Sequence, residues 1–262
     1  MNKYFTFIFK IGISFQLMLL VACSQPNPLD DLEVWDLVYI SDSTGWGVPD
    51  KFAANIERDT GKEVIVHSWA EGGLPALRVL DDLYAETLPR NLREDIAEAE
   101  VIIFIANPRG DPEKGGINIG GIETCMNTLS CREPENCTSE FYDPYVENLK
   151  TIYAEIFSLR AGQPTIIRAV DLYNPIISEH QECGTETVCT RCWETFNATL
   201  LQAAGEYGVP LVRVYELFNG PDHDQDPREK GYIGHDGEHT NETGQQAIAD
   251  LLSQAGYEPL IP

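Results

Sequence analysis

Apolar segments of strand length alternate along this chain with segments whose apolar residues recur at helical spacing. Such alternation is typical of repeated βα units, which build a parallel sheet covered by helices on both faces. Strands are expected near Leu37–Ser41, Glu63–Trp69, Val101–Ala106, Pro164–Val170 and Pro210–Val214. Helices are expected near Pro49–Arg58, Leu74–Ala85, Pro89–Ala97, Tyr142–Leu159, Cys192–Tyr207 and Asn241–Gln254. The pattern predicts one α/β domain over residues 35–262, a three-layer α/β/α sandwich with a five-stranded parallel sheet.

Two stretches interrupt this alternation, near residues 109–141 and 173–190. Both are rich in residues that favour turns, and six of the seven cysteines lie in or beside them. Each stretch follows the end of a predicted strand, where open α/β sheets bind their ligands. We therefore expect two cysteine-bearing loop insertions beside the functional site.

The N-terminus has the features of an export signal. Lys3 and Lys10 precede twelve mainly apolar residues, Ile11–Ala22, a run too short to span a bilayer but suited to a signal-peptide core. The run ends Leu20-Val21-Ala22-Cys23, which resembles the lipobox of bacterial lipoproteins. That resemblance implies a signal peptide at 1–22, an acylated Cys23, a tether at 23–34, and a lipid-anchored protein of the bacterial cell envelope. The alternative is an ordinary secretory signal and a secreted protein.

Six cysteines remain once Cys23 is assigned to lipid: Cys125, Cys131, Cys137, Cys183, Cys189 and Cys192. An even number in an exported chain favours disulfide bonds, whose connectivity the sequence leaves open. The spacing Cys189-x2-Cys192 would also suit half of a zinc site. Disulfides are the preferred interpretation, and no metal or cofactor is expected.

The charge balance restricts the partners. Lys and Arg total 18 against 42 Asp and Glu, so the net charge is −24. Such a chain repels nucleic acid phosphates, which excludes a nucleic-acid-binding function.

Two short motifs at opposite ends of the domain could supply a nucleophile and its base. Ser43 lies in Ser41-Asp42-Ser43-Thr44, between the first predicted strand and the first helix, where backbone N–H groups converge and can stabilise an oxyanion. Asp236 precedes His239 by three residues, a spacing that lets the carboxylate orient the imidazole. Taken singly, the first motif could be a helix cap and the second a surface turn.

Two further positions could bind the same substrate oxygen. Gly72 and Gly73 follow the second predicted strand, and a glycine there lets a backbone N–H approach a ligand closely. Asn107 ends the third strand, and its amide could donate a hydrogen bond. The ordinary alternatives are a helix-entry turn and a turn-forming Asn before Pro108.

Together these blocks resemble the SGNH hydrolase superfamily, the GDSL esterases and lipases, from about Leu37 to Gln254. Asp236-Gly237-Glu238-His239-Thr240-Asn241 is similar to the family's Asp-Gly-x-His-Pro-Asn, whereas Ser41 replaces a Gly in the first block and Ile105 and Pro108 replace the Gly and Asp around Asn107. The resemblance implies a flavodoxin-like SGNH hydrolase fold. It makes Ser43 the nucleophile, His239 the general base and Asp236 its orienting partner. The oxyanion hole would combine Ser43, Gly73 and Asn107, with Gly72 as the neighbouring alternative to Gly73.

The function that follows is a serine esterase or lipase acting on a small-molecule, glycan or lipid ester. Two alternatives stay open. One is a carbohydrate O-deacetylase of the same fold, and the other is a non-catalytic lipoprotein that binds a glycan or peptide.

Overall fold

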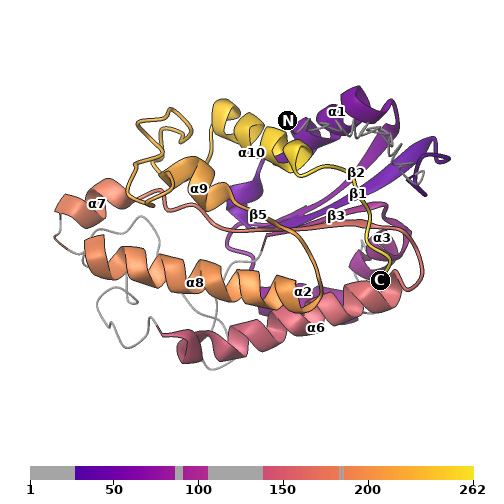
Figure 1. Ribbon diagram of the computed structural model, residues 1–262, viewed down its shortest axis with the longest axis horizontal. Coiled ribbons are helices and arrows are strands. Elements are labelled where there is room, and N and C mark those ends of the chain that lie inside the picture. Colours follow the sequence, from indigo (N-terminus) through magenta and orange to yellow (C-terminus); the bar gives the residue numbers. More distant parts are fainter. Residues whose placement is uncertain (1–26, 86–90, 106–137, 183, 185) are drawn as a thin grey trace, which may run out of the picture.

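The protein is a five-stranded parallel sheet between two layers of helices. The computed structural model describes residues 27–85, 91–105, 138–182, 184 and 186–262. The strands are β1 (Val34–Ser41), β2 (Glu63–Ala70), β3 (Val101–Ile105), β4 (Ile166–Val170) and β5 (Leu211–Val212), in the order β2-β1-β3-β4-β5. The helices are α1 (Val48–Thr60), α2 (Ala76–Tyr84), α3 (Leu92–Glu98), α6 (Asp143–Leu159), α7 (Ile177–Glu182), α8 (Glu186–Glu206), α9 (Val214–Asn219) and α10 (Glu242–Gln254). Figure 1 shows α1 and α10 on one face of the sheet and α2, α3, α6 and α8 on the other, which confirms the predicted α/β sandwich.

Burial on both faces explains the mainly apolar sequences of the central strands. Every residue of β3 and of β4 is buried, because helices cover both faces of the central strands. Such strands appear in a sequence as continuous apolar runs. β2 lies at the edge of the sheet, and its residues are partly or fully exposed.

Local signals define the helix ends. α1 begins after Gly47, whose φ of 73° is left-handed, and carries Pro49 in its first turn; it ends at Gly61, with φ of 72°. The side chain of Asn241 caps α10 by accepting hydrogen bonds from two backbone amides of the first turn.

The segment expected to be a tether is in part folded. Leu29 is 1% exposed and belongs to the core, and Asn27 Nδ2 donates to the carbonyl of Tyr257 at 3.1 Å. The prediction of a tether through residue 34 is therefore wrong for residues 27–34. The buried side chain of Leu29 and the hydrogen bond from Asn27 to Tyr257, 230 residues later, hold this segment on the domain.

Two other expectations are corrected. The stretch 173–190 is not an irregular loop throughout, since it contains α7 and the first residues of α8. The fifth strand ends at Val212 because α9 begins at Val214, where Asp171 Oδ1 accepts a hydrogen bond from the amide of Tyr215 at 2.8 Å.

Residues 109–137 lie outside the described part of the chain. No described helix has both the length and the apolar character that crossing a membrane requires.

Candidate active site

The end of β1 delivers Ser43 to the carboxyl edge of the sheet. Asp42 is buried and caps the short 3-10 helix Ser43–Gly45 by accepting the amide of Thr44 at 2.9 Å. A Cβ on Gly45 would overlap the side chain of Ser41, so the turn requires a glycine there. The helix-capping residue of this motif is therefore Asp42. Ser43, the next residue, is partly exposed at the start of the turn.

A compact loop presents His239 just before α10. An isolated bridge between Ile233 and Thr240 closes the loop, and within it the amide of Gly234 donates to the carbonyl of His239 at 2.7 Å. Gly237 has a left-handed φ of 77°, which a residue with a side chain would adopt at a cost. The loop therefore has a defined shape set by its own hydrogen bonds.

Asp236 makes three hydrogen bonds inside this loop. Its Oδ1 accepts the amides of Glu238 and His239, each at 3.0 Å, and its Oδ2 lies 2.7 Å from His239 Nδ1. Partial burial raises the pKa of Asp236, but these hydrogen bonds outweigh it, so the pKa is lower than usual. An ionised carboxylate facing Nδ1 holds the proton of a neutral imidazole on that nitrogen and leaves Nε2 as an acceptor.

Trp46 brings the serine motif next to the histidine motif. Its ring stacks on the His239 ring, with centroids 5.1 Å apart and planes 19° from parallel. Trp46 is three residues beyond Ser43, so segments from opposite ends of the chain meet here. Among the hydrogen bonds of the described residues, none joins Ser43 Oγ to His239, and that contact stays a prediction. The sequence reasoning missed Trp46; the available signal was an aromatic residue just after the candidate nucleophile.

The turn after β2 also lies next to Trp46. A Cβ on Gly72 would be 3.4 Å from Trp46 Cζ2, and the amide of Glu71 donates to the carbonyl of Ser41 at 3.1 Å, which ties the turn to the end of β1. Gly73 has a left-handed φ of 66°. Within the described residues, the N–H groups of Gly72 and Gly73 make no backbone hydrogen bond, and their part in an oxyanion hole stays a prediction. Asn107 and Cys23 lie outside the described residues.

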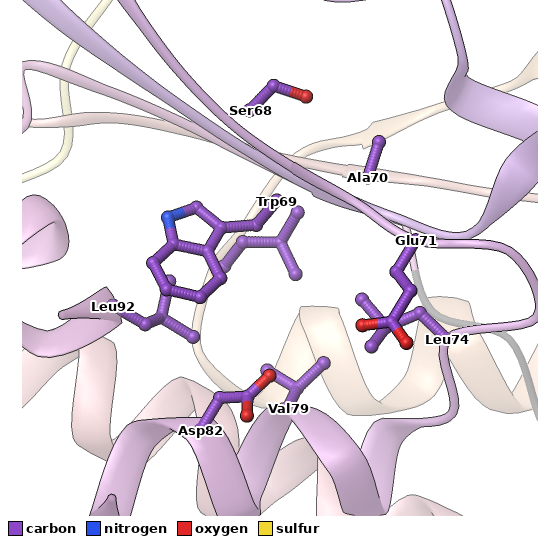
Figure 2. A pocket seen from close by; sticks show the side chains of 9 residues that line it. Ser68, Trp69, Ala70, Glu71, Leu74, Val79, Asp82 and Leu92 are labelled. Carbon is purple, nitrogen blue, oxygen red and sulfur yellow. The ribbon is translucent and has the colours of Figure 1, made fainter. Parts of the chain in front are cut away.

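A pocket of about 290 Å³ adjoins this turn. Figure 2 shows Trp69, near the end of β2, and Glu71, just after it, facing Asp82 and Val79 of α2. Burial raises the pKa of Asp82; Arg78 opposes this, and the charge of Glu71 adds to it. The pocket thus combines an indole ring with two carboxyl groups.

The described residues contain no group of three His, Cys, Asp or Glu side chains that could hold a metal ion. Cys189 and Cys192 are buried on α8, and both are disulfide-bonded in the structure. A disulfide sulfur is no longer a thiolate that could bind zinc.

Solved structures with the same architecture identify the fold. A lipase from a goat rumen metagenome is 19% identical, with a TM-score of 0.62 over 86% of this chain and 98% of that one. The chain has the SGNH hydrolase fold. An acetyl xylan esterase from Geobacillus stearothermophilus (13% identity, TM-score 0.52, 86% and 96% covered) and a lipase/acylhydrolase from Enterococcus faecalis (13%, 0.50, 85% and 95%) are also similar. No protein-family model matches the sequence, and no curated protein matches it.

In this SGNH hydrolase fold, the first and last blocks of the sequence motif meet at one edge of the sheet. Ser43 follows β1, the Gly72–Gly73 turn follows β2, and Asp236 and His239 precede α10. Backbone donors, a potential nucleophile and an oriented imidazole are the groups that acyl transfer requires.

Proposed function

We propose that the protein is an exported ester hydrolase that cleaves carboxylic esters through an acyl-enzyme on Ser43. The observation that carries the proposal is the stack of Trp46 on His239, which brings the segment of Ser43 beside an imidazole already oriented by Asp236. The names of the similar structures, which include lipases and an acetyl xylan esterase, support ester hydrolysis as the class of reaction.

The chemistry proceeds in two halves. His239 Nε2 accepts the proton of Ser43 Oγ as the oxygen attacks the ester carbonyl carbon, and the imidazolium then gives that proton to the departing alcohol. Water attacks the acyl-enzyme in the same way, which releases the acid and restores Ser43. The oxyanion would accept hydrogen bonds from the N–H of Ser43, from Gly73 (or Gly72), and from the side chain of Asn107.

Hydrolysis of p-nitrophenyl acetate tests the proposal. Wild type should release p-nitrophenol catalytically, whereas Ser43→Ala should lose the activity and keep its circular dichroism spectrum. Ser158→Ala removes an exposed serine of α6 and should match wild type. A folded wild type without turnover on any ester would favour the non-catalytic binding alternative, and full activity in Ser43→Ala would rule out this nucleophile.

A carbohydrate O-deacetylase is the second candidate, and the pocket beside Gly72 supports it. Hydroxyl groups of a sugar donate to carboxylates such as Asp82 and Glu71, while its C–H face packs on an indole such as that of Trp69. A purely apolar pocket would instead favour a long acyl chain.

Substrate comparison separates the two candidates. For an O-acetylated oligosaccharide, Asp82→Asn should raise KM about 10- to 100-fold, since hydrogen bonds to a charged group are worth about 1.5–3 kcal/mol, and should leave p-nitrophenyl acetate hydrolysis unchanged. Asp81→Asn, which alters the exposed neighbour, is the matched control. Preference for long-chain esters, with no effect of Asp82→Asn on any substrate, would reject the deacetylase.

Membrane anchoring through an acylated Cys23 is part of the proposal. Three residues, 24–26, separate Cys23 from the packed Asn27. At about 3.3–3.6 Å per residue, this linker reaches about 14 Å at most, so the anchor would hold the amino edge of the sheet at the membrane surface. The site at the carboxyl edge would then face away from the bilayer. Cys23→Ala should release the protein from the membrane fraction, and a wholly soluble wild type without lipid mass would contradict the anchor.

A further inference from the structure

Tyr173 joins the sheet to the loop that carries His239. It lies three residues beyond the end of β4, and its ring is buried against Phe218, with centroids 4.6 Å apart. Its hydroxyl donates to the carbonyl oxygen of Glu238 at 3.0 Å. That carbonyl belongs to the peptide unit whose N–H is the amide of His239, so the contact is made directly beside the imidazole-bearing residue.

Among the described residues, Tyr173 makes the one hydrogen bond that links residues 234–239 to a segment outside this loop. In the described part of the chain, the other hydrogen bonds of residues 234–239 join two residues of the loop itself. These bonds fix the shape of the loop and hold Asp236 on His239, but they do not fix its position relative to β1 and Ser43. The side chain of Asp236 is 52% exposed, so core packing does little to hold this part of the loop.

The hydroxyl of Tyr173 is a permanent donor. Burial raises its pKa well above the ordinary value, and the negative charges of Asp42, Glu238 and Asp236 raise it further. The proton therefore stays on the oxygen throughout the pH range in which esters are assayed. Because the ring is fixed between Phe218 and the end of β4, the donor has a fixed position relative to the sheet.

We infer that Tyr173 is a positioning residue, whose hydroxyl sets the place of His239 relative to Ser43 by binding the carbonyl of Glu238. This inference rests on the proposed function. Trp46 restrains one face of the imidazole, and Tyr173 restrains the backbone directly before His239. Trp46 follows β1 and Tyr173 follows β4 of the same sheet. The sheet that carries Ser43 therefore also holds His239 in position.

Tyr173→Phe tests the inference, because it deletes the hydroxyl and keeps the buried ring. Tyr215→Phe is the matched control: the Tyr215 hydroxyl is also buried, but it has no hydrogen-bond partner among the described residues. With p-nitrophenyl acetate, Tyr173→Phe should lower kcat about tenfold or more and leave KM unchanged, since a misplacement of about 1 Å can cost about 10²-fold. Tyr215→Phe should keep the wild-type kcat.

Hydrogen exchange supplies a second readout that does not depend on activity. Amides of residues 234–241 should exchange faster in Tyr173→Phe, while those of β3 and β4 should exchange as in wild type. Unchanged kcat in a folded Tyr173→Phe, or unchanged exchange in the loop, would overturn the inference. If wild type hydrolyses no ester, the proposed function fails, and the exchange comparison still decides whether Tyr173 holds the loop.

Discussion

Replacing Asp236 by Asn probes the orientation of the imidazole with a change of one atom. Asp236 Oδ1 already accepts two backbone amides at 3.0 Å, and this arrangement keeps an oxygen at that position in Asp236→Asn. The new amide nitrogen must then face His239 Nδ1, in place of the oxygen that lies at 2.7 Å. An N–H pointing at Nδ1 favours the tautomer with its proton on Nε2, which cannot accept the proton of Ser43.

The expected loss of kcat/KM in Asp236→Asn has two causes, the lost negative charge and the changed tautomer of His239. Two unit charges about 4 Å apart attract by about 1 kcal/mol in water and by about 4 kcal/mol at an effective dielectric constant of about 20. The side chains of His239 and Asp236 are 28% and 52% exposed, so solvent screens their attraction and its value lies between these limits. Since about 1.36 kcal/mol corresponds to tenfold in rate, the lost charge accounts for about 5-fold to about 10³-fold. The unfavourable tautomer adds to this, and we expect kcat/KM to fall about 10³-fold.

Initial rates with p-nitrophenyl acetate between pH 6 and about pH 9 measure the effect. Part of the activity of Asp236→Asn should return at the alkaline end, where hydroxide assists the attack. Asp224→Asn removes another exposed carboxylate and should keep the wild-type rate. A rate for Asp236→Asn within about threefold of wild type would refute the orienting role.

Three further predictions concern the surroundings of the site. Trp46→Ala should lower kcat/KM about 2- to 13-fold, because a ring stack contributes about 0.5–1.5 kcal/mol, and Trp46→Phe should retain most of the activity. Burial raises the pKa of Asp171 to about 6 from 3.8. The folded state therefore binds this proton more tightly than the unfolded state does. As pH rises from about 4 to about 6, the free energy of unfolding measured in urea should fall by at most about 3 kcal/mol. Asp171→Asn should not show this loss. Mild reductant should change esterase activity before the far-ultraviolet circular dichroism signal, since the sequence predicts that the cysteine-bearing segments lie beside the site; an unchanged activity would contradict this.

The sheet could be predicted because each central strand carries its own signal. Val101–Ile105 and Ile166–Val170 are buried on both faces, and their largely apolar sequences, which only Arg168 interrupts, predict strands without knowledge of what packs on them. The Asp236 and His239 pair was equally accessible, because both side chains lie in one loop and their spacing alone sets the contact.

The rest depended on contacts between distant residues. Leu29 belongs to the buried core, and Asn27 bonds to Tyr257, 230 residues later, so the local sequence of this segment predicts a tether and does not reveal that it packs on the domain. α9 begins at Val214 because Asp171, more than 40 residues earlier, accepts a hydrogen bond from the amide of Tyr215 in its first turn. Tyr173 contacts the carbonyl of Glu238 and Trp46 contacts the ring of His239, and in both cases the partner lies far away in the sequence.

The central claim is that Ser43 is a nucleophile activated by His239. Incubation with an alkyl fluorophosphonate, which forms a phosphonyl ester with an activated serine and releases fluoride, followed by peptide mass spectrometry, tests it most directly. The account predicts one adduct on the peptide that contains Ser43, no adduct in Ser43→Ala, and labelling at least about 10²-fold slower in His239→Ala. An adduct on another serine, or equal labelling in wild type and His239→Ala, would contradict it.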